Sequence, residues 1–180
     1  MSRMTNLLRR TRSFFQRDSG SATIEFALAL PFVMTLFLTS FELGTLLTRN
    51  VMLDRGLDMA VRDVRLGLIS PLTEETLRDR ACEAAVIIPD CENQLRLEMR
   101  PLDPRDFSNI PADADCIDRG DPEASLRQFV PGISNQLMII RACVLFDPMT
   151  PGAAFGKMLY DAREDGAYAL VSTSAYVVEP

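Results

Sequence analysis

The chain has 180 residues and a formal net charge of −6, and it contains no histidine. This length holds one modest domain and an anchor, and the absence of histidine excludes triads and metal sites built on that residue. Residues 1–20 carry five arginines and one aspartate, a net charge of +4, which leaves −10 on the remaining residues. Because the body is acidic, we expect no nucleic-acid partner.

An apolar segment follows the basic residues. Residues 26–41 contain no charged side chain, and the wider segment 22–47 spans roughly 39 Å at about 1.5 Å per residue, enough to cross a membrane. Glu25 and Glu42 lie near its two ends, where a carboxylate is tolerated better than at the centre. Pro31 lies inside the segment and predicts a kink or a locally loosened helix.

The arginines predict the orientation of this helix. Basic residues stay on the cytoplasmic side of a membrane, so the body is expected outside the cytoplasm. All four cysteines follow the apolar segment, and a compartment outside the cytoplasm permits disulfides. A cleaved secretory signal peptide and a plain signal anchor remain alternatives. Against cleavage, the apolar core is longer than a signal peptide needs, and Leu38-Thr39-Ser40 is a poor cleavage site.

A more specific motif lies at the boundary between the basic and apolar residues. Gly20 ends the polar head, Glu25 is the fifth residue beyond it, and Phe26 follows. A glycine before an apolar helix, with glutamate at the fifth place, resembles the processing site of type IV prepilins and pseudopilins. The chain further resembles the TadE-like pseudopilins of the tight-adherence (Flp) pilus, strongly over residues 19–65 and loosely beyond. The other residues that carry this resemblance are Leu30-Pro31, Glu42-Leu43-Gly44 and the C-terminal Ala175–Pro180.

The resemblance implies cleavage by a prepilin peptidase between Gly20 and Ser21. Glu25, Phe26 and Pro31 are then the residues for recognition and assembly. The new amine at Ser21 lies about one helical turn from Glu25, and an amine and a carboxylate together cost less in lipid than either alone. In an assembled stack the pair can form between neighbouring subunits and set their register. The alternative is a glutamate that reaches the lipid head groups.

The resemblance also implies a division of the chain and a set of partners. Residues 1–20 form a cytoplasmic leader, residues 21–47 a single transmembrane helix, and residues 48–180 a periplasmic domain. The expected partners are the prepilin peptidase, inner-membrane lipid, other pilins or pseudopilins, and the inner-membrane pilus platform. The expected function is that of a minor pseudopilin, of TadE or TadF type, in a bacterial pilus for adhesion. A single-pass periplasmic binding or sensing module is the alternative.

Helical periodicity continues past the membrane. Apolar residues recur on one face as far as Leu68, while charged residues fill the other positions, so one helix is predicted from about Thr23 to Leu68. A second helix is predicted over residues 74–87, capped by Thr73 and closed by Pro89. The apolar face of the long helix comprises Leu53, Leu57, Ala60, Val61, Val64 and Leu68, and the charged face Asp54, Arg55, Asp58, Arg62, Asp63 and Arg65.

The remaining elements have a period of two. Residues 95–99 alternate apolar and polar, which predicts a half-buried strand, and residues 137–146 are apolar on nearly both faces, as in a central strand. Residues 169–178 form the third strand, with Tyr168, Ser172, Ser174 and Tyr176 facing one way. We therefore expect an α+β fold in which an antiparallel sheet packs on the long helix.

The four cysteines can form disulfides, and one of them lies in the long loop over residues 103–132. No C-x-x-C pair is present, and three disulfide connectivities are possible. We prefer the pairs Cys116 with Cys143 and Cys82 with Cys91. The first pair closes the larger loop, and closing a loop of that size adds roughly 3–4 kcal/mol of stability. Free, buried thiols are the alternative.

The same loop is rich in acidic residues. Their spacing misses the EF-hand pattern, so a solvated acidic loop is favoured over a calcium site. No histidine base, no G-x-S-x-G motif and no phosphate-binding glycine loop is present, so we expect no enzyme activity, no catalytic residue, no metal and no cofactor. The acidic residues of the loop are Asp113, Asp115, Asp118, Asp121 and Glu123.

Overall fold

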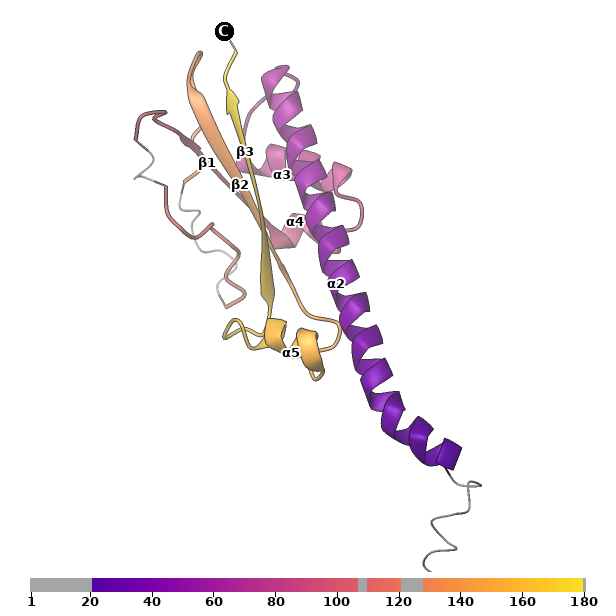
Figure 1. Cartoon of the computed structure of the whole chain (residues 1–180). Coiled ribbons are helices and arrows are strands. Elements are labelled where there is room, and N and C mark those ends of the chain that lie inside the picture. Colours follow the sequence, from indigo (N-terminus) through magenta and orange to yellow (C-terminus); the bar gives the residue numbers. More distant parts are fainter. Residues whose placement is uncertain (1–20, 107–109, 121–127, 180) are drawn as a thin grey trace, which may run out of the picture.

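The computed structural model describes residues 21–106, 110–120 and 128–179. It confirms the predicted α+β fold: a long N-terminal helix is followed by a small antiparallel sheet (Figure 1). The elements are α2 (Ser21–Arg65), α3 (Glu74–Ala84), α4 (Cys91–Gln94), β1 (Leu95–Pro101), β2 (Leu137–Phe146), α5 (Ala154–Tyr160) and β3 (Tyr168–Val177).

Helix α2 runs continuously for 45 residues and passes through Pro31. It ends close to the predicted position, because Gly67 has a positive φ of 67° that glycine adopts at little cost. The amide of Leu68 donates to the carbonyl oxygen of Asp63 at 2.9 Å and satisfies one of the last free carbonyls. The side chain of Leu68 is 69% exposed, so its assignment to the buried face of the helix was wrong.

The second half of α2 supplies its apolar face to the core. Leu53, Leu57 and Ala60 are each at most 1% exposed, as the periodicity predicted. Asp63 departs from the predicted solvated face: it is 8% exposed and forms an ion pair with Arg80 of α3. A buried carboxylate needs such a partner because desolvation penalises the charge.

Helix α3 begins at Glu74 and is capped as predicted by Thr73, which forms a capping box with Thr76. It ends at Ala84, three residues before the predicted end, because the chain turns there and buries Ile88 in the core. The helix packs closely on α2 at Gly56, where an added Cβ would lie 2.6 Å from the carbonyl oxygen of Ala81. Glycine therefore permits the close approach of the two helices.

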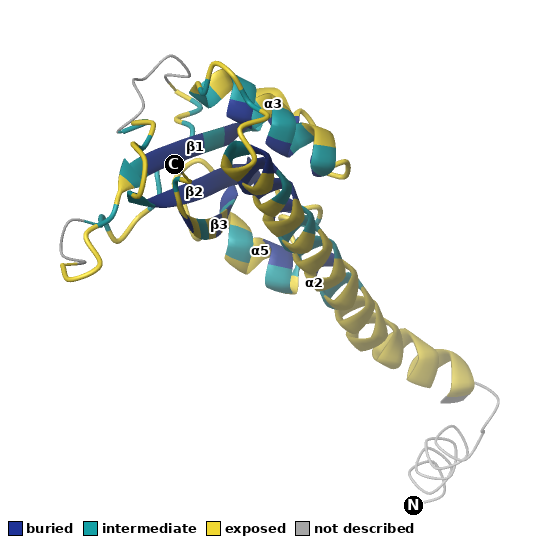
Figure 2. Ribbon diagram, turned by 90° about the horizontal axis from the view of Figure 1, so that it is seen from above, coloured by how far each residue is buried: buried dark blue, intermediate teal, exposed yellow. Residues whose placement is uncertain are grey.

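The three strands lie in the order β1-β2-β3, and both pairings are antiparallel. Strand β2 is the central strand, as predicted. The sheet face toward α2 and α3 is apolar and buried (Figure 2). The predicted orientation of β3 is confirmed in its buried members, Tyr168, Ser172 and Tyr176, whereas Thr173 and Ala175 are exposed.

Tyr176 provides a pH-dependent test of this core. Burial raises the pKa of its hydroxyl above the ordinary value, so the stability that the neutral ring contributes is present below about pH 10 and lost as the pH rises through the raised pKa. Tyr176→Phe is expected to cost about 0.5 kcal/mol at pH 8, because the hydroxyl forms only a weak bond to the sulfur of Met99 at 3.7 Å. It should lose less stability than wild type between pH 8 and pH 11 in urea unfolding.

The control for this test is Tyr160→Phe, because the side chain of Tyr160 is 49% exposed. This variant should follow the wild-type pH dependence. Equal alkaline losses in Tyr176→Phe and wild type would contradict the assignment of Tyr176 to the alkaline transition.

Candidate functional site: the apolar half of helix α2

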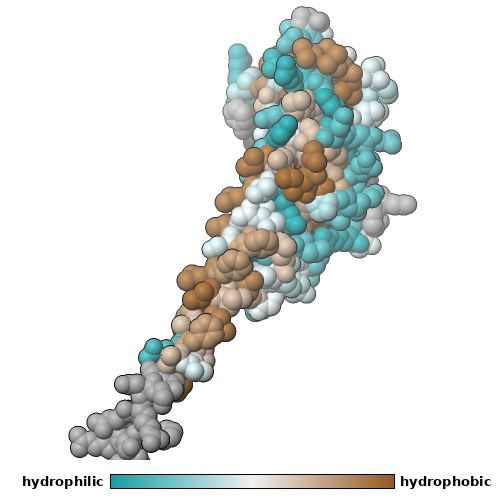
Figure 3. All heavy atoms as spheres, turned by 90° about the vertical axis from the view of Figure 1, so that its right-hand side faces the viewer, coloured by the Kyte–Doolittle hydropathy of each residue, from teal (hydrophilic) through white to brown (hydrophobic). Residues whose placement is uncertain are grey.

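The first half of α2 extends away from the domain (Figure 1). Residues 22–37 are exposed on every side, and Figure 3 shows apolar side chains over this part of the helix. Phe32 and Leu36 are 74% and 69% exposed. A helix that is apolar all round needs lipid or other helices as its surroundings. Its large exposed side chains include Ile24, Phe26, Leu28, Leu30, Phe32, Val33, Met34, Leu36, Phe37 and Phe41.

Two hydroxyls in this half bond within the helix itself. Thr35 donates to the carbonyl oxygen of Pro31 at 2.7 Å, and Ser40 donates to that of Leu36 at 2.8 Å. Such bonds allow hydroxyls to enter an apolar medium at low cost. Residues 21–41 measure roughly 31 Å at about 1.5 Å per residue, close to the thickness of a bilayer core, about 30 Å.

This helix has the properties of a single-pass anchor. Among the described residues it is the one helix long and apolar enough to cross a membrane, with a mean hydropathy of 1.8 in its most apolar window. None of that window is buried within the protein. A helix of the soluble core would be mostly covered, so a lipid environment accounts for the exposure better.

Three of the predicted recognition residues lie on this exposed half. Glu25, Phe26 and Pro31 are all exposed, and α2 begins at Ser21. Glu25 follows Ser21 by four residues, a spacing that places both on one side of a helix. Gly20, the other residue of the predicted cleavage site, lies outside the described residues.

The first buried side chain described along α2 is Glu42, within the 21–47 segment predicted to cross the membrane. The side chain of Glu42 is 1% exposed, and it accepts hydrogen bonds from the backbone amides of Met149 and Thr150, both at 3.0 Å, and from the Thr150 hydroxyl at 2.9 Å. The sequence suggested an acid at the lipid interface, whereas the structure places this carboxylate under the loop that precedes α5. The membrane boundary itself stays a prediction.

The four cysteines form two disulfides, Cys82–Cys91 and Cys116–Cys143, which are the pairings preferred from the sequence. The first joins α3 to α4. The second joins the long loop to β2. Both cross-links restrict the unfolded chain, and the second also ties the loop to the central strand of the sheet.

A buried charge cluster holds the long loop, and the sequence analysis did not find it. Glu98 is 1% exposed and Arg141 6%, and an Arg141 Nη2 to Glu98 Oε1 hydrogen bond of 2.6 Å joins β2 to β1. Arg141 also donates to the carbonyl oxygens of Pro111 and Asp113, at 2.7 and 3.1 Å. The lone arginine inside the apolar run of β2 could have indicated this cluster from the sequence, because a charge at a central position requires a buried partner.

The predicted acidic loop is therefore partly anchored to the sheet. The amide of Asp115 donates to Glu98 at 3.2 Å, whereas Asp118 is exposed. The other two acids of the loop, at positions 121 and 123, lie outside the described residues. No group of three or more metal-ligating side chains placed to hold an ion is found in the described part of the chain.

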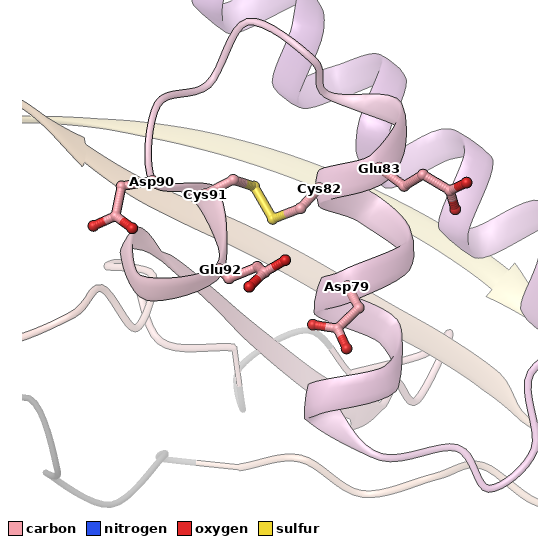
Figure 4. A pocket seen from close by; sticks show the side chains of 6 residues that line it. All are labelled: Asp79, Cys82, Glu83, Asp90, Cys91 and Glu92. Carbon is pink, nitrogen blue, oxygen red and sulfur yellow. A yellow bond between two sulfur atoms is a disulfide. The ribbon is translucent and has the colours of Figure 1, made fainter.

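A second acidic feature surrounds the Cys82–Cys91 disulfide. Figure 4 shows it beside the turn between α3 and α4, where a cavity of about 440 Å³ is open to solvent. The cavity lacks apolar side chains other than the two cysteines, so it offers little surface for an organic ligand. Its lining consists of Asp79, Cys82, Glu83, Asp90, Cys91 and Glu92.

The described residues thus form an α+β domain carried on one apolar helix compatible with a membrane anchor. Residues 20–62, which include most of α2, match the model of the TadE-like protein family, which confirms the resemblance seen in the sequence. The match suggests involvement in a Tad pilus system. No curated protein and no solved structure matches the chain.

Proposed function

We propose that the protein is a minor pseudopilin that contributes to the assembly of a tight-adherence (Flp) pilus. Its precursor is held in the inner membrane with the arginine-rich leader in the cytoplasm and the α+β domain in the periplasm. The observation that carries the proposal is the fully exposed apolar half of α2, which begins at Ser21 and has Glu25 four residues later. Its role is to make contacts rather than to catalyse a reaction.

The proposed processing step accounts for the presence of Glu25 in the apolar helix. A prepilin peptidase hydrolyses the bond between Gly20 and Ser21 and creates a charged amine at Ser21. A carboxylate near this amine lowers the cost of placing both in lipid. In an assembled structure the amine of one subunit pairs with Glu25 of a neighbour, and this pair selects one axial register.

The proposed partners follow from the same surface. The exposed side chains between Phe26 and Phe41 pack against the helices of sister pilins or pseudopilins and against the inner-membrane platform. Because lipid is as apolar as these side chains, shape and the Glu25 pair rather than hydrophobicity select the neighbour.

The first experiment determines the N-terminus of the protein from native inner membranes by mass spectrometry, with a peptidase-deficient strain in parallel. We expect an N-terminus at Ser21 in the wild type and the complete leader in the deficient strain. An uncleaved leader in both strains would overturn the proposed processing and favour the alternative of an anchored periplasmic binding or sensing module.

A second experiment replaces Glu25 by alanine. Because this side chain is exposed, the free energy of unfolding should change by no more than about 0.5 kcal/mol, while pilus assembly should be lost. Glu25→Asp is the matched control, since it keeps the charge and should retain part of the assembly, measured as pili per cell. Unchanged processing and unchanged pilus number in Glu25→Ala would refute the role of this residue.

A further inference from the structure

Two constraints place the outer surface of the bilayer near Glu42 of α2. Residues 21–41 measure roughly 31 Å at about 1.5 Å per residue, and the hydrocarbon core of a bilayer is about 30 Å thick. The loop that covers the Glu42 carboxylate is irregular, and its Met149 and Thr150 amides donate to that carboxylate at 3.0 Å. Irregular backbone is not tolerated in hydrocarbon, so the hydrocarbon ends at or before this loop.

Helix α5 follows this loop and lies at the same end of the domain. Figure 1 shows it at the end from which the exposed half of α2 extends, and it contacts α2. Gly156 of α5 packs so closely on the loop that an added Cβ would collide with the carbonyl oxygen of Thr150. The loop and the helix, residues 148–160, therefore form one unit beside the membrane end of the domain, here called the α5 unit.

The α5 unit differs in charge from the rest of the acidic domain. Its thirteen residues, PMTPGAAFGKMLY, contain one charged side chain, Lys157, which is also the only lysine of the chain. The next five residues, DARED, contain four charged side chains. A segment with few charges and a long cationic side chain suits the head-group layer of a membrane, because lysine reaches lipid phosphates while its stem stays among apolar groups.

The exposed side chains of the α5 unit are apolar or amphipathic. Met158 is 71% exposed, Met149 52% and Tyr160 49%, whereas Leu159 packs against the core. Amphipathic helices at a bilayer surface bury their apolar side chains about 5–10 Å into the boundary between head groups and acyl chains, and tyrosine is enriched at that depth. Exposed apolar residues such as Ile133 occur elsewhere in the domain, so position beside the anchor, and not exposure alone, distinguishes this unit.

The two carboxylates that flank the unit are paired. Asp147 forms an ion pair with Arg119 at 2.7 Å, and Asp161 forms one with Lys157 at 2.8 Å. Pairing lowers both the repulsion between a carboxylate and anionic lipid and the cost of partial desolvation. The charges at the borders of the α5 unit therefore do not oppose its contact with a membrane.

We propose that the α5 unit lies in the head-group layer of the same bilayer that α2 crosses, as a second contact between the domain and the membrane. Met149 and Met158 reach the upper part of the acyl chains, and Lys157 lies beside the lipid phosphates. A single helix leaves the domain free to tilt, and the second contact limits this tilt. The proposal rests on the proposed function only through the membrane anchor and does not depend on cleavage after Gly20.

Tryptophan fluorescence of the full chain tests the proposal, because the chain has no tryptophan of its own. Met158→Trp is reconstituted in vesicles of phosphatidylcholine and phosphatidylglycerol whose acyl chains carry bromine either close to the head group or near the chain end. Bromine quenches tryptophan on contact. Because an interfacial side chain lies only about 5–10 Å deep, we expect the shallow bromines to quench at least about twofold more strongly than the deep ones.

Two exposed apolar positions provide matched controls. Leu68→Trp lies beyond the other end of α2 and should be quenched by neither lipid. Phe32→Trp lies near the middle of the anchor and should be quenched most by the deep bromines. If Met158→Trp were quenched no more than Leu68→Trp in vesicles that quench Phe32→Trp, the proposal would be overturned while the anchor stood. Absence of quenching in Phe32→Trp would overturn the anchor and this proposal together.

A second reporter separates lipid contact from protein contact. Met149→Trp keeps the backbone bond to Glu42 and should also be quenched by the shallow bromines. Adding Met158→Asp places a carboxylate at the proposed interface and should reduce this quenching, whereas adding Leu68→Asp should not. Quenching that persists with Met158→Asp would contradict contact through α5. Emission of Met158→Trp that is shielded from aqueous iodide, yet not quenched by lipid, would show that a second copy covers α5 and would overturn the proposal.

Discussion

Glu42→Ala is expected to lower the free energy of unfolding by about 2–4 kcal/mol. The carboxylate accepts three hydrogen bonds, from two amides and one hydroxyl of the loop before α5. Alanine would leave these donors without their acceptor and open a cavity under the loop. Because Met149 is itself 52% exposed, water can replace part of the loss, which keeps the expected cost below the sum of three fully buried bonds.

The measurement is urea unfolding of the full chain in detergent, followed by circular dichroism. Thr150→Val removes only the hydroxyl donor and should cost about 1 kcal/mol. Glu25→Ala serves as the second control, because its carboxylate is exposed. If Glu42→Ala and Glu25→Ala unfolded at the same urea concentration, the hydrogen bonds of Glu42 would contribute nothing to stability.

Under the proposed function, the position of Glu42 also connects stability with assembly. It is the first buried residue of α2, so it fixes where the domain meets the helix. A domain that loosens here would shift relative to the exposed apolar half. We therefore expect Glu42→Ala to impair pilus assembly even at temperatures where the protein remains folded.

The elements with a strong hydrophobic period were predictable from the sequence. The apolar run of β2 gave its limits, 137–146, without error. The limits of α2 and β3 were correct to within three residues. In these segments, burial on one or both faces determines the structure, and a period in the sequence records that burial directly.

The short helices α4 and α5 were not predicted. Helix α4 has four residues and no side-chain cap, and α5 has seven residues with Ala153 at its N-cap. Asp90 at the N-cap of α4 is a favoured residue type but makes no side-chain cap bond, and neither helix is long enough to show a helical period. Tertiary contacts hold them: the Cys82–Cys91 disulfide for α4, and Gly156 of α5 against Thr150.

The buried polar contacts were the hardest to predict. Glu42, Asp63 and Glu98 all lie at positions that a periodic pattern assigns to water or to the lipid interface, yet each is at most 8% exposed. Their partners are distant in the sequence, for example 107 residues from Glu42 to Met149. Only the three-dimensional packing brings such pairs together, whereas the exposed motif around Glu25 is local and could be read directly.

The strongest effect is expected for Glu98→Ala, which should lower the free energy of unfolding by about 3–5 kcal/mol. Glu98 is the buried acceptor for Arg141 and Arg100 and for the amide of Asp115. Its removal leaves the buried guanidinium of Arg141 without its carboxylate and frees the loop from β1. Urea unfolding gives the cost, and rapid proteolysis within residues 110–120 should report the released loop.

A second substitution separates the lost charge from the lost contact. In Glu98→Leu with Arg141→Leu, both members of the pair become apolar, and such replacements are often neutral or stabilising. Arg141 Nε is one of the buried atoms in the described residues that lack a hydrogen-bond partner, so the native cluster is not fully satisfied. We expect the double variant to recover at least half of the stability lost in Glu98→Ala, while the loop remains sensitive to protease because its carbonyls have lost Arg141. A double variant as unstable as Glu98→Ala would show that the carboxylate acts mainly through Arg100 and the loop amide.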